Sequence, residues 1–220
     1  MHLSEIVNAL RNPEAYDEEV DYIRVLQTHI SYIFLTGRYA YKIKKPVNFG
    51  FLDFTTLEKR RFYCEEEVRL NRRLCGDMYI GVLPITYSSG KFKIAGSGEP
   101  VEYTVKMREL PQEALMSERL KRGEIDVEVM DDIARILSGF HRRADTNSEI
   151  REYGSIRIVK FNWDENFNQT RKFIGRTIGR GEYLFIKRVI NEFLERQKSL
   201  FELRQKSDRI RECHGDLHSG

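Results

Sequence analysis

The sequence is poor in cysteine, and its cysteines do not form the patterns that build disulfide frameworks or metal sites. Cys64, Cys75 and Cys213 are an odd number of thiols without Cys-x-x-Cys spacing. Such a set is typical of reduced thiols in the cytoplasm and supports neither a disulfide framework nor a structural zinc site. We therefore expect a cytoplasmic protein that depends on a hydrophobic core, for which 220 residues are ample.

Long apolar runs and an excess of one charge are also absent. No apolar stretch approaches the roughly 20 residues that a membrane span requires, and the N-terminus lacks the basic start and apolar run of a signal peptide. Lys and Arg number 37 against 34 Asp and Glu, a net charge of +3. Because the charges are so balanced, we expect neither a membrane nor a nucleic acid as partner.

The first half of the chain has the residue pattern of strands with one helix between them. Residues 28–44 hold two β-rich runs around a Thr-Gly-Arg turn, which predicts a hairpin. Residues 57–75 have helical periodicity with threonine caps before them, and residues 79–107 return to the strand pattern. A short connector at residues 108–112 follows. The pattern therefore predicts a β-rich lobe over residues 1–107.

After Pro111 the chain is mainly helical. One amphipathic helix is indicated by the stripe Met130, Ile133, Ala134, Leu137 and His141. A second is expected over residues 183–204, with a buried stripe of Ile186, Ile190, Phe193 and Leu200. In a loop expected after Lys160, Trp163 and Glu165 are candidates for an acceptor pocket, with core packing as the competing role for Trp163. Together these features predict an α+β fold of two lobes, the second over residues 113–220.

Two charged positions in the first lobe stand out by their periodicity. In the strand around residues 39–44, Lys42 and Lys44 share one face, opposite the face of Tyr41. In the helix over residues 57–75, Glu67 falls on the apolar, inward face, at helical spacing from cysteine and leucine side chains. A carboxylate that points at a core requires a cationic partner.

The residues from His214 to Gly220 carry the most specific motif, His-Gly-Asp. Protein kinases use H-R-D-x-x-x-x-N, in which the Asp accepts the proton of the substrate hydroxyl and the Asn binds magnesium. Laid on this sequence, that pattern makes Asp216 the base and places the Asn just after Gly220. We therefore expect the sequence to be a fragment without the metal ligands, and inactive or nearly so by itself.

The motif resembles the catalytic loop of the aminoglycoside phosphotransferase and choline kinase-like superfamily. Residues 41–54 (YKIKKPVNFGFLDF) and 64–74 (CEEEVRLNRRL) resemble a narrower prokaryotic family of phosphotransferase-like proteins of largely unknown substrate. Some members of that family are fused to a C-terminal P-loop ATPase domain, so such a fused domain is a candidate partner in the whole protein. The resemblance extends from about Tyr22 to the end of the chain.

The resemblance implies a bilobal protein-kinase-like fold and an ATP- and Mg²⁺-dependent kinase that acts on a hydroxyl of an unidentified small molecule. It implies that Lys42, with Lys44 as the alternative, binds phosphates and that Glu67 holds this lysine. Residues 107–110 match the hinge, where backbone groups of Arg108 and Leu110 would bind adenine, while His214 and His218 would shape the catalytic loop. The superfamily commonly lacks the G-x-G-x-x-G loop, and Thr28-His29-Ile30-Ser31 occupies its place here.

Two other interpretations remain open at this stage. His214, Asp216 and His218 alternate along the chain and could serve as three ligands of a catalytic metal in a hydrolase. Alternatively, the chain is a kinase-shaped binding module without catalysis, whose basic residues over 171–176 and 180–188 contact phosphates of a partner. Solvated surface is the simpler explanation of those basic residues.

Overall fold

A computed structural model describes residues 2–50 and 52–217 of the chain. The chain divides into two compact units, one running to Val127 and also taking in the residues from Asp216 on, and one over Glu128–Gly215. All strands of the described residues lie in the first unit, and the second is helical. The chain thus has the expected α+β class. The division falls after Val127, and the role of residues 108–112 as a hinge stays a prediction.

The first unit is built on one antiparallel sheet with the strand order β1-β2-β3-β6-β4-β5. The strands are β1 (Arg24–Gln27), β2 (Ser31–Leu35), β3 (Tyr39–Lys44), β4 (Tyr79–Ser88), β5 (Lys91–Ile94) and β6 (Pro100–Arg108). The predicted hairpin is confirmed, since β2 pairs with β3 across the turn at residues 36–38. Because β3 also pairs with β6, the strand that carries Lys42 is an interior strand of the sheet.

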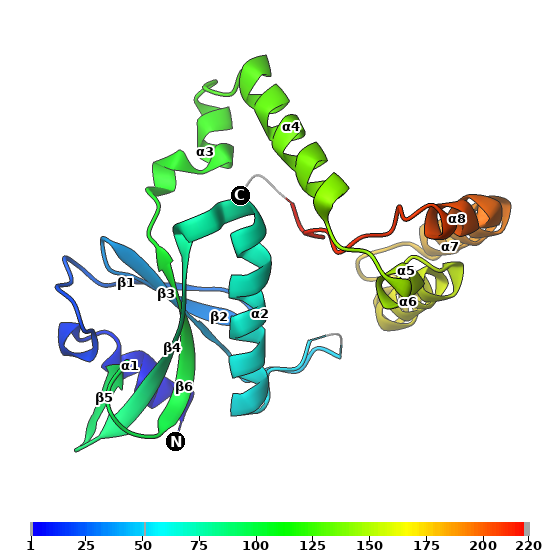
Figure 1. The fold of residues 1–220 in the computed structure, drawn as a ribbon. Coiled ribbons are helices and arrows are strands. Elements are labelled where there is room, and N and C mark those ends of the chain that lie inside the picture. Colours follow the sequence, from blue (N-terminus) through cyan, green and yellow to red (C-terminus); the bar gives the residue numbers. More distant parts are fainter. Residues whose placement is uncertain (1, 51, 218–220) are drawn as a thin grey trace. The chain divides into compact units, whose positions relative to one another are not determined.

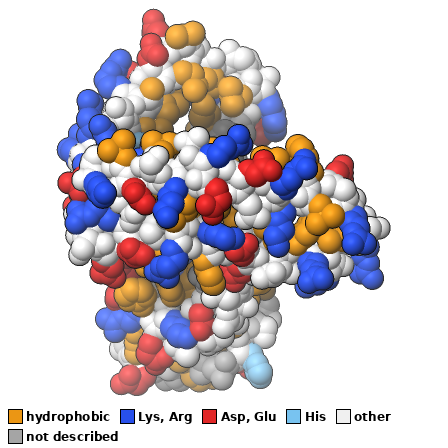
Figure 2. All heavy atoms as spheres, turned by 90° about the vertical axis from the view of Figure 1, so that its right-hand side faces the viewer, with side chains coloured by type: hydrophobic (Ala, Val, Ile, Leu, Met, Phe, Trp, Pro, Cys, Tyr) orange, Lys and Arg blue, Asp and Glu red, His pale blue; other side chains and the backbone are white. Residues whose placement is uncertain are grey.

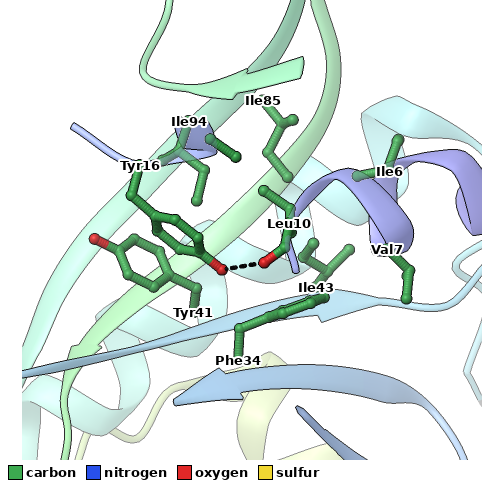
Figure 3. Packing of buried hydrophobic residues seen from close by; sticks show 10 residues of the cluster. Ile6, Val7, Leu10, Tyr16, Phe34, Tyr41, Ile43, Ile85 and Ile94 are labelled. Atoms are coloured by element: carbon green, nitrogen blue, oxygen red, sulfur yellow. Dashed lines mark hydrogen bonds between the residues drawn. The ribbon is translucent and has the colours of Figure 1, made fainter. Parts of the chain in front are cut away.

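One face of the sheet holds the larger apolar core. The helix α1 (Leu3–Ala9) and the short 3₁₀ helix η1 (Pro13–Ala15) cover it. Figure 3 shows side chains from these elements and from the strands pointing toward one another. The Tyr16 hydroxyl donates to the Leu10 carbonyl over 2.7 Å, and its ring meets that of Tyr41 edge-on. Tyr41 and Ile43 thus face this core, as the alternation of β3 predicts.

The helix α2 (Leu57–Cys75) lies along the opposite face of the sheet, over β4 and β6 (Figure 1). Its bounds are those expected from the sequence, and the Thr56 hydroxyl caps it by accepting from the Lys59 amide. Cys64 and Val68 of α2 pack against Val105 of β6 in a second apolar cluster. After α2 come η2 (Gly76–Met78) and, beyond β6, η3 (Gln112–Ala114) and α3 (Met116–Lys121).

In the second unit, α6 and α7 pack through a small aromatic core. Its elements are α4 (Val127–Arg143, which begins one residue before the unit), α5 (Ser148–Glu152), α6 (Ile156–Thr170), η4 (Arg171–Phe173), α7 (Arg180–Arg196) and α8 (Lys198–Lys206). The rings of Phe167 and Tyr183 meet edge-on at 5.5 Å, and the Tyr183 hydroxyl donates to the Phe167 carbonyl over 2.8 Å. With Leu194 these are among the buried residues that join α6 to α7.

Three expectations for the helical half are wrong. The single helix over residues 183–204 is two helices, because Gln197 leaves helical geometry between α7 and α8. The expected stripe is not the buried one: Ile186, Phe193 and Leu200 are exposed, and α7 turns Tyr183 and Leu194 inward instead. The loop expected after Lys160 is the middle of α6, since Ser155 caps a helix that continues to Thr170, and Trp163 and Glu165 are both exposed on it.

No helix in the described part of the chain combines the length and the apolar character that crossing a membrane would require.

Shortening a core side chain should destabilise the first unit far more than the same change at its surface. Ile43 is 0% exposed and Ile80 is 38% exposed. We expect Ile43→Ala to lower the free energy of unfolding by about 2–5 kcal/mol, because it removes buried methyl groups and leaves a cavity. The matched control Ile80→Ala should cost about 1 kcal/mol or less. Urea unfolding monitored by fluorescence would measure both, and equal losses would contradict the placement of this core.

Candidate functional site

Three charged side chains gather where α2 crosses the sheet. Lys42 and Lys44 leave the same face of β3, because side chains two residues apart on a strand point the same way. Opposite Lys42 in the register is Val105, which belongs to the apolar cluster under α2. Helical periodicity directs Glu67 of α2 down toward this face. The sheet and the helix thus bring together residues that are more than 20 positions apart in the sequence.

Glu67 binds both lysines, one with each carboxylate oxygen. Lys42 Nζ lies 2.8 Å from Glu67 Oε1, and Lys44 Nζ lies 2.6 Å from Glu67 Oε2. The side chain of Glu67 is only 12% exposed. An ion pair that is so little exposed to solvent keeps its geometry, because separating the partners would leave a buried charge without compensation. The cationic partner expected for an inward carboxylate is present twice.

The electrostatics of the cluster favour the ionised carboxylate. Burial opposes the charge on Glu67, but attraction and hydrogen bonding from Lys42 and Lys44 outweigh it, so the pKa of Glu67 is lowered. Burial also raises the pKa of the neighbouring Tyr79 hydroxyl to about 12, and the negative charge of Glu67 adds to this effect. Burial likewise raises the pKa of the Cys64 thiol to about 12, so Cys64 stays a neutral packing residue.

The two lysines differ in how far solvent reaches them. The side chain of Lys42 is 24% exposed, whereas that of Lys44 is 5% exposed and has its ammonium 5.0 Å from the centre of the Phe54 ring. A ligand phosphate can approach only an ammonium that retains access to solvent. Lys42 is therefore the available cation, and Lys44 is the one that fastens Glu67 from the buried side.

A second buried ion pair fixes the N-terminal end of α2. Arg60 Nε donates to both carboxylate oxygens of Glu102 on β6, at 3.0 and 2.8 Å, and its Nη1 donates to the Phe54 carbonyl. No local pattern predicts this pair, because Arg60 and Glu102 are 42 residues apart and each alone is an ordinary charged residue. Its effect is to hold the helix that carries Glu67 in a set position over the sheet.

The turn between β1 and β2, at the place of the missing glycine-rich loop, is closed by side chains instead of glycine. The Thr28 hydroxyl accepts from the Ile30 and Ser31 amides at 3.3 and 3.0 Å. Lys45 donates to the Thr28 carbonyl, and its ammonium lies over the Tyr32 ring. This turn is therefore tight and held by local hydrogen bonds.

The expected hinge is tied to the β2–β3 turn by a residue that the sequence analysis did not single out. The carboxylate of Glu109 accepts from the Thr36 and Gly37 amides, each at 2.8 Å, and from the Tyr22 hydroxyl. Arg108 ends β6 and pairs with Asp77, so its guanidinium points to other protein groups. Leu110 is exposed, and its backbone makes no hydrogen bond to another described backbone group. Its carbonyl accepts a long hydrogen bond, 3.5 Å, from the side-chain amide of Gln112.

Asp216 and His214 are exposed and lie in the segment without helix or strand that follows α8. The structure thus brings together Lys42, Lys44 and Glu67, whereas Asp216 belongs to a separate stretch of the chain, and its role as a base stays a prediction. His218 lies outside the described residues. Within the described ranges, no group of three or more His, Cys, Asp or Glu side chains could hold a metal ion.

Comparisons with known proteins find relatives of this chain, but the names of these relatives give no activity. No protein-family model and no solved structure matches the chain. It is similar to the uncharacterized proteins Rv2004c of Mycobacterium tuberculosis and Mb2027c of Mycobacterium bovis. Each is 32% identical over 196 residues, which are 89% of this chain. The chain spans 38% of the length of these relatives.

Removing the charge of Glu67 should destabilise the first unit in a pH-dependent way. Because Glu67→Gln leaves Lys42 and Lys44 without a carboxylate, we expect a loss of about 3 kcal/mol in the free energy of unfolding at neutral pH. The pKa of Glu67 is lowered from 4.5, so the contribution of its charge is complete above pH 4.5 and is lost as the pH falls through the lowered pKa. The difference between the two proteins should therefore vanish in acid.

Urea unfolding at a series of pH values measures this difference. The matched control is Glu65→Gln on the same helix, whose exposed carboxylate pairs with Arg61 and should contribute about 0.5 kcal/mol or less. A difference between wild type and Glu67→Gln that persists unchanged at low pH would contradict the electrostatic account.

Proposed function

We propose that this chain is part of an ATP-dependent phosphotransferase with a bilobal protein-kinase-like fold, acting on a hydroxyl of a small molecule. The ion pair between Lys42 of an interior strand and Glu67 of the helix over the sheet is the observation that carries the proposal. Kinases use such a strand lysine, held by a helix glutamate, to bind the phosphates of ATP. An antiparallel sheet with one helix over this face supports the same assignment.

The residues of the first unit fit a nucleotide. Lys42 keeps a solvent-accessible ammonium while Glu67 fixes its direction, and Lys44 keeps Glu67 ionised from the buried side. At the end of β6, the backbone of Leu110 is the first candidate to bind the edge of an adenine, which would replace the long bond from the Gln112 side chain to its carbonyl, and the backbone of Arg108 is the second candidate. Bound ATP would supply the phosphoryl group that is transferred.

The second part of the proposal concerns the transfer itself. Asp216 is proposed to accept the proton of the acceptor hydroxyl as that oxygen attacks phosphorus, with His214 shaping the loop. In the kinase pattern the magnesium-binding Asn follows the base by five positions, so the proposal places the ligands of Mg²⁺ beyond Gly220. A fused P-loop domain is likewise assigned there.

Lys42→Met should weaken ATP binding by about tenfold or more, because one charge-assisted contact to phosphate is lost. The variant should still fold, since Lys44 continues to neutralise Glu67. Lys106 provides the matched control. It is also a half-buried lysine of an interior strand with a carboxylate partner, Glu18 at 3.0 Å, but it lies on the other face of the sheet beside Tyr41.

Calorimetric titration of the intact protein with ATP and Mg²⁺ would compare these variants. The proposal requires Lys106→Met to bind ATP as the wild type does. If Lys44→Met weakens binding and Lys42→Met does not, the roles of the two lysines are reversed. If neither Lys42→Met nor Lys44→Met changes the affinity for ATP, the nucleotide site is not on this face of the sheet.

Asp216→Asn should separate chemistry from binding. We expect turnover of the intact protein, measured as ADP released from ATP, to fall about a hundredfold or more, because the amide cannot accept the proton. Affinity for ATP should not change. Asp145→Asn, which changes an exposed aspartate of the second unit, is the control and should keep full turnover. Undiminished turnover by Asp216→Asn would refute its role, and ATP binding without turnover in the wild type would favour a binding module.

A further inference from the structure

The second unit contains a cleft lined by four arginines. The cleft has a volume of about 720 Å³ and lies between α4, the end of α8 and the segment after it. Its lining residues are Ala134, Leu137, Ser138, His141, Arg142, Arg204, Arg209, Arg211 and Cys213. The set contains no Asp or Glu. A volume of this size is within the usual range for small-molecule sites, roughly 300–1,000 Å³.

The wall formed by residues 209–213 is held in place by hydrogen bonds that do not use the other arginines. Arg211 Nη1 donates to the Ala144 carbonyl over 2.7 Å, and the Glu212 amide donates to the Asp145 carbonyl over 2.9 Å. The Thr146 hydroxyl donates to the Ile210 carbonyl over 2.8 Å. The segment is thus fastened along the end of α4, and the cleft is a built feature of this unit.

The remaining arginines have no protein partner to neutralise them. Within the described residues, the side chains of Arg142, Arg204 and Arg209 make no ion pair or hydrogen bond with another side chain or backbone group. Arg151 of the same unit, in contrast, pairs with Asp208 at 2.7 Å. Three unneutralised guanidinium groups around one cleft repel one another, and an anion bound between them removes this repulsion.

We propose that this cleft binds the phosphate group of a small phosphomonoester. The planar donor fork of arginine matches phosphate oxygens, and a phosphomonoester carries a charge of about −1.5 to −2 at neutral pH, which offsets more of the cluster than a single carboxylate does. Ser138 and His141 add polar groups to the wall, and Leu137 adds an apolar surface for the rest of the ligand. The proposal does not depend on the phosphotransferase activity.

The shape and charge of the unit favour a small ligand over a nucleic acid. On the face of the whole molecule drawn in Figure 2, Lys and Arg side chains lie among Asp and Glu over most of the surface, and basic side chains predominate only at its right-hand end. A protein that follows a nucleic-acid backbone needs a continuous positive stripe instead. The four arginines of the cleft gather around one open space, which suits a compact dianion.

A second basic cleft in the same unit provides an internal control. It has a volume of about 500 Å³ and is lined by Arg171, Arg180 and Lys187, together with the aromatic ring of Tyr183. It is the smaller of the two and holds two arginines instead of four. Neutralising Arg171 and Arg180 removes the same charge from the same unit without touching the cleft at Arg204 and Arg209.

The test is calorimetric titration of the intact protein with glycerol 3-phosphate and with inorganic phosphate, at constant ionic strength. Glycerol serves as the uncharged counterpart. We expect saturable binding of both anions and none of glycerol. The double variant Arg204→Gln/Arg209→Gln should weaken the binding about tenfold or more, because charge-assisted contacts to phosphate are lost. Neither side chain has a partner among the described residues, so the fold should persist, and circular dichroism checks this.

Two controls locate the binding. Arg171→Gln/Arg180→Gln and Lys106→Met should both bind glycerol 3-phosphate as the wild type does. The proposal is overturned if Arg204→Gln/Arg209→Gln binds with wild-type affinity, or if either control variant loses the binding instead. It is also overturned if a short single-stranded oligonucleotide binds more tightly than glycerol 3-phosphate through Arg204 and Arg209, since the cleft would then belong to a nucleic-acid surface.

Discussion

The burial of one carboxylate between two lysines is the constraint on which the first unit depends. A lone charge at the position of Glu67 would be strongly disfavoured, so α2 can lie on the sheet only where Lys42 and Lys44 meet it. This fixes the position of the helix along β3. The Arg60–Glu102 pair fixes its other end against β6, and the apolar cluster of Cys64, Val68 and Val105 fills the space between.

The two faces of the sheet consequently differ in the side chains that they bury. Tyr41 and Ile43 face α1 in a core of apolar side chains, where stability comes from burial alone. The face under α2 combines a smaller apolar cluster with ion pairs, one of which leaves an ammonium accessible to solvent. An interior strand is a rigid support for that ammonium, because hydrogen-bonded neighbours on both sides hold its backbone. Such rigidity is what a phosphate-binding lysine requires.

The second, helical unit differs from the first in the surroundings of its basic residues. Its buried core is small, centred on Phe167, Tyr183 and Leu194, and large apolar side chains such as Phe185 and Phe193 are exposed. Arginines from separate segments surround a cleft without acidic residues. In the first unit, Lys42 and Lys44 share the carboxylate of Glu67. The arginines of the cleft, in contrast, have no carboxylate among the residues that line it. This contrast is why the two positive regions suggest different roles, a positioned lysine in one and a ligand pocket in the other.

The sequence by itself determined the local elements. Alternation placed Lys42 and Lys44 opposite Tyr41, and helical periodicity together with a threonine cap set the bounds of α2 and turned Glu67 inward. It failed at Gln197, where no Gly or Pro announces the break, and at Trp163, where the charged and polar residues of α6 resemble a loop. Periodicity reports only on residues that are close in the chain. The break at Gln197 and the helix around Trp163 depend on packing against residues that are distant in the chain.

Only the tertiary structure decided which groups meet. The difference in solvent access between Lys42, 24% exposed, and Lys44, 5% exposed, follows from how α2 and Phe54 lie over β3. The Glu109 carboxylate reaches the turn at Thr36 across 73 residues. The four-arginine cleft joins positions from 142 to 211. Partners at such separations carry no signal in one sequence, because their proximity is created by the packing of helices and strands and not by any local preference of the chain.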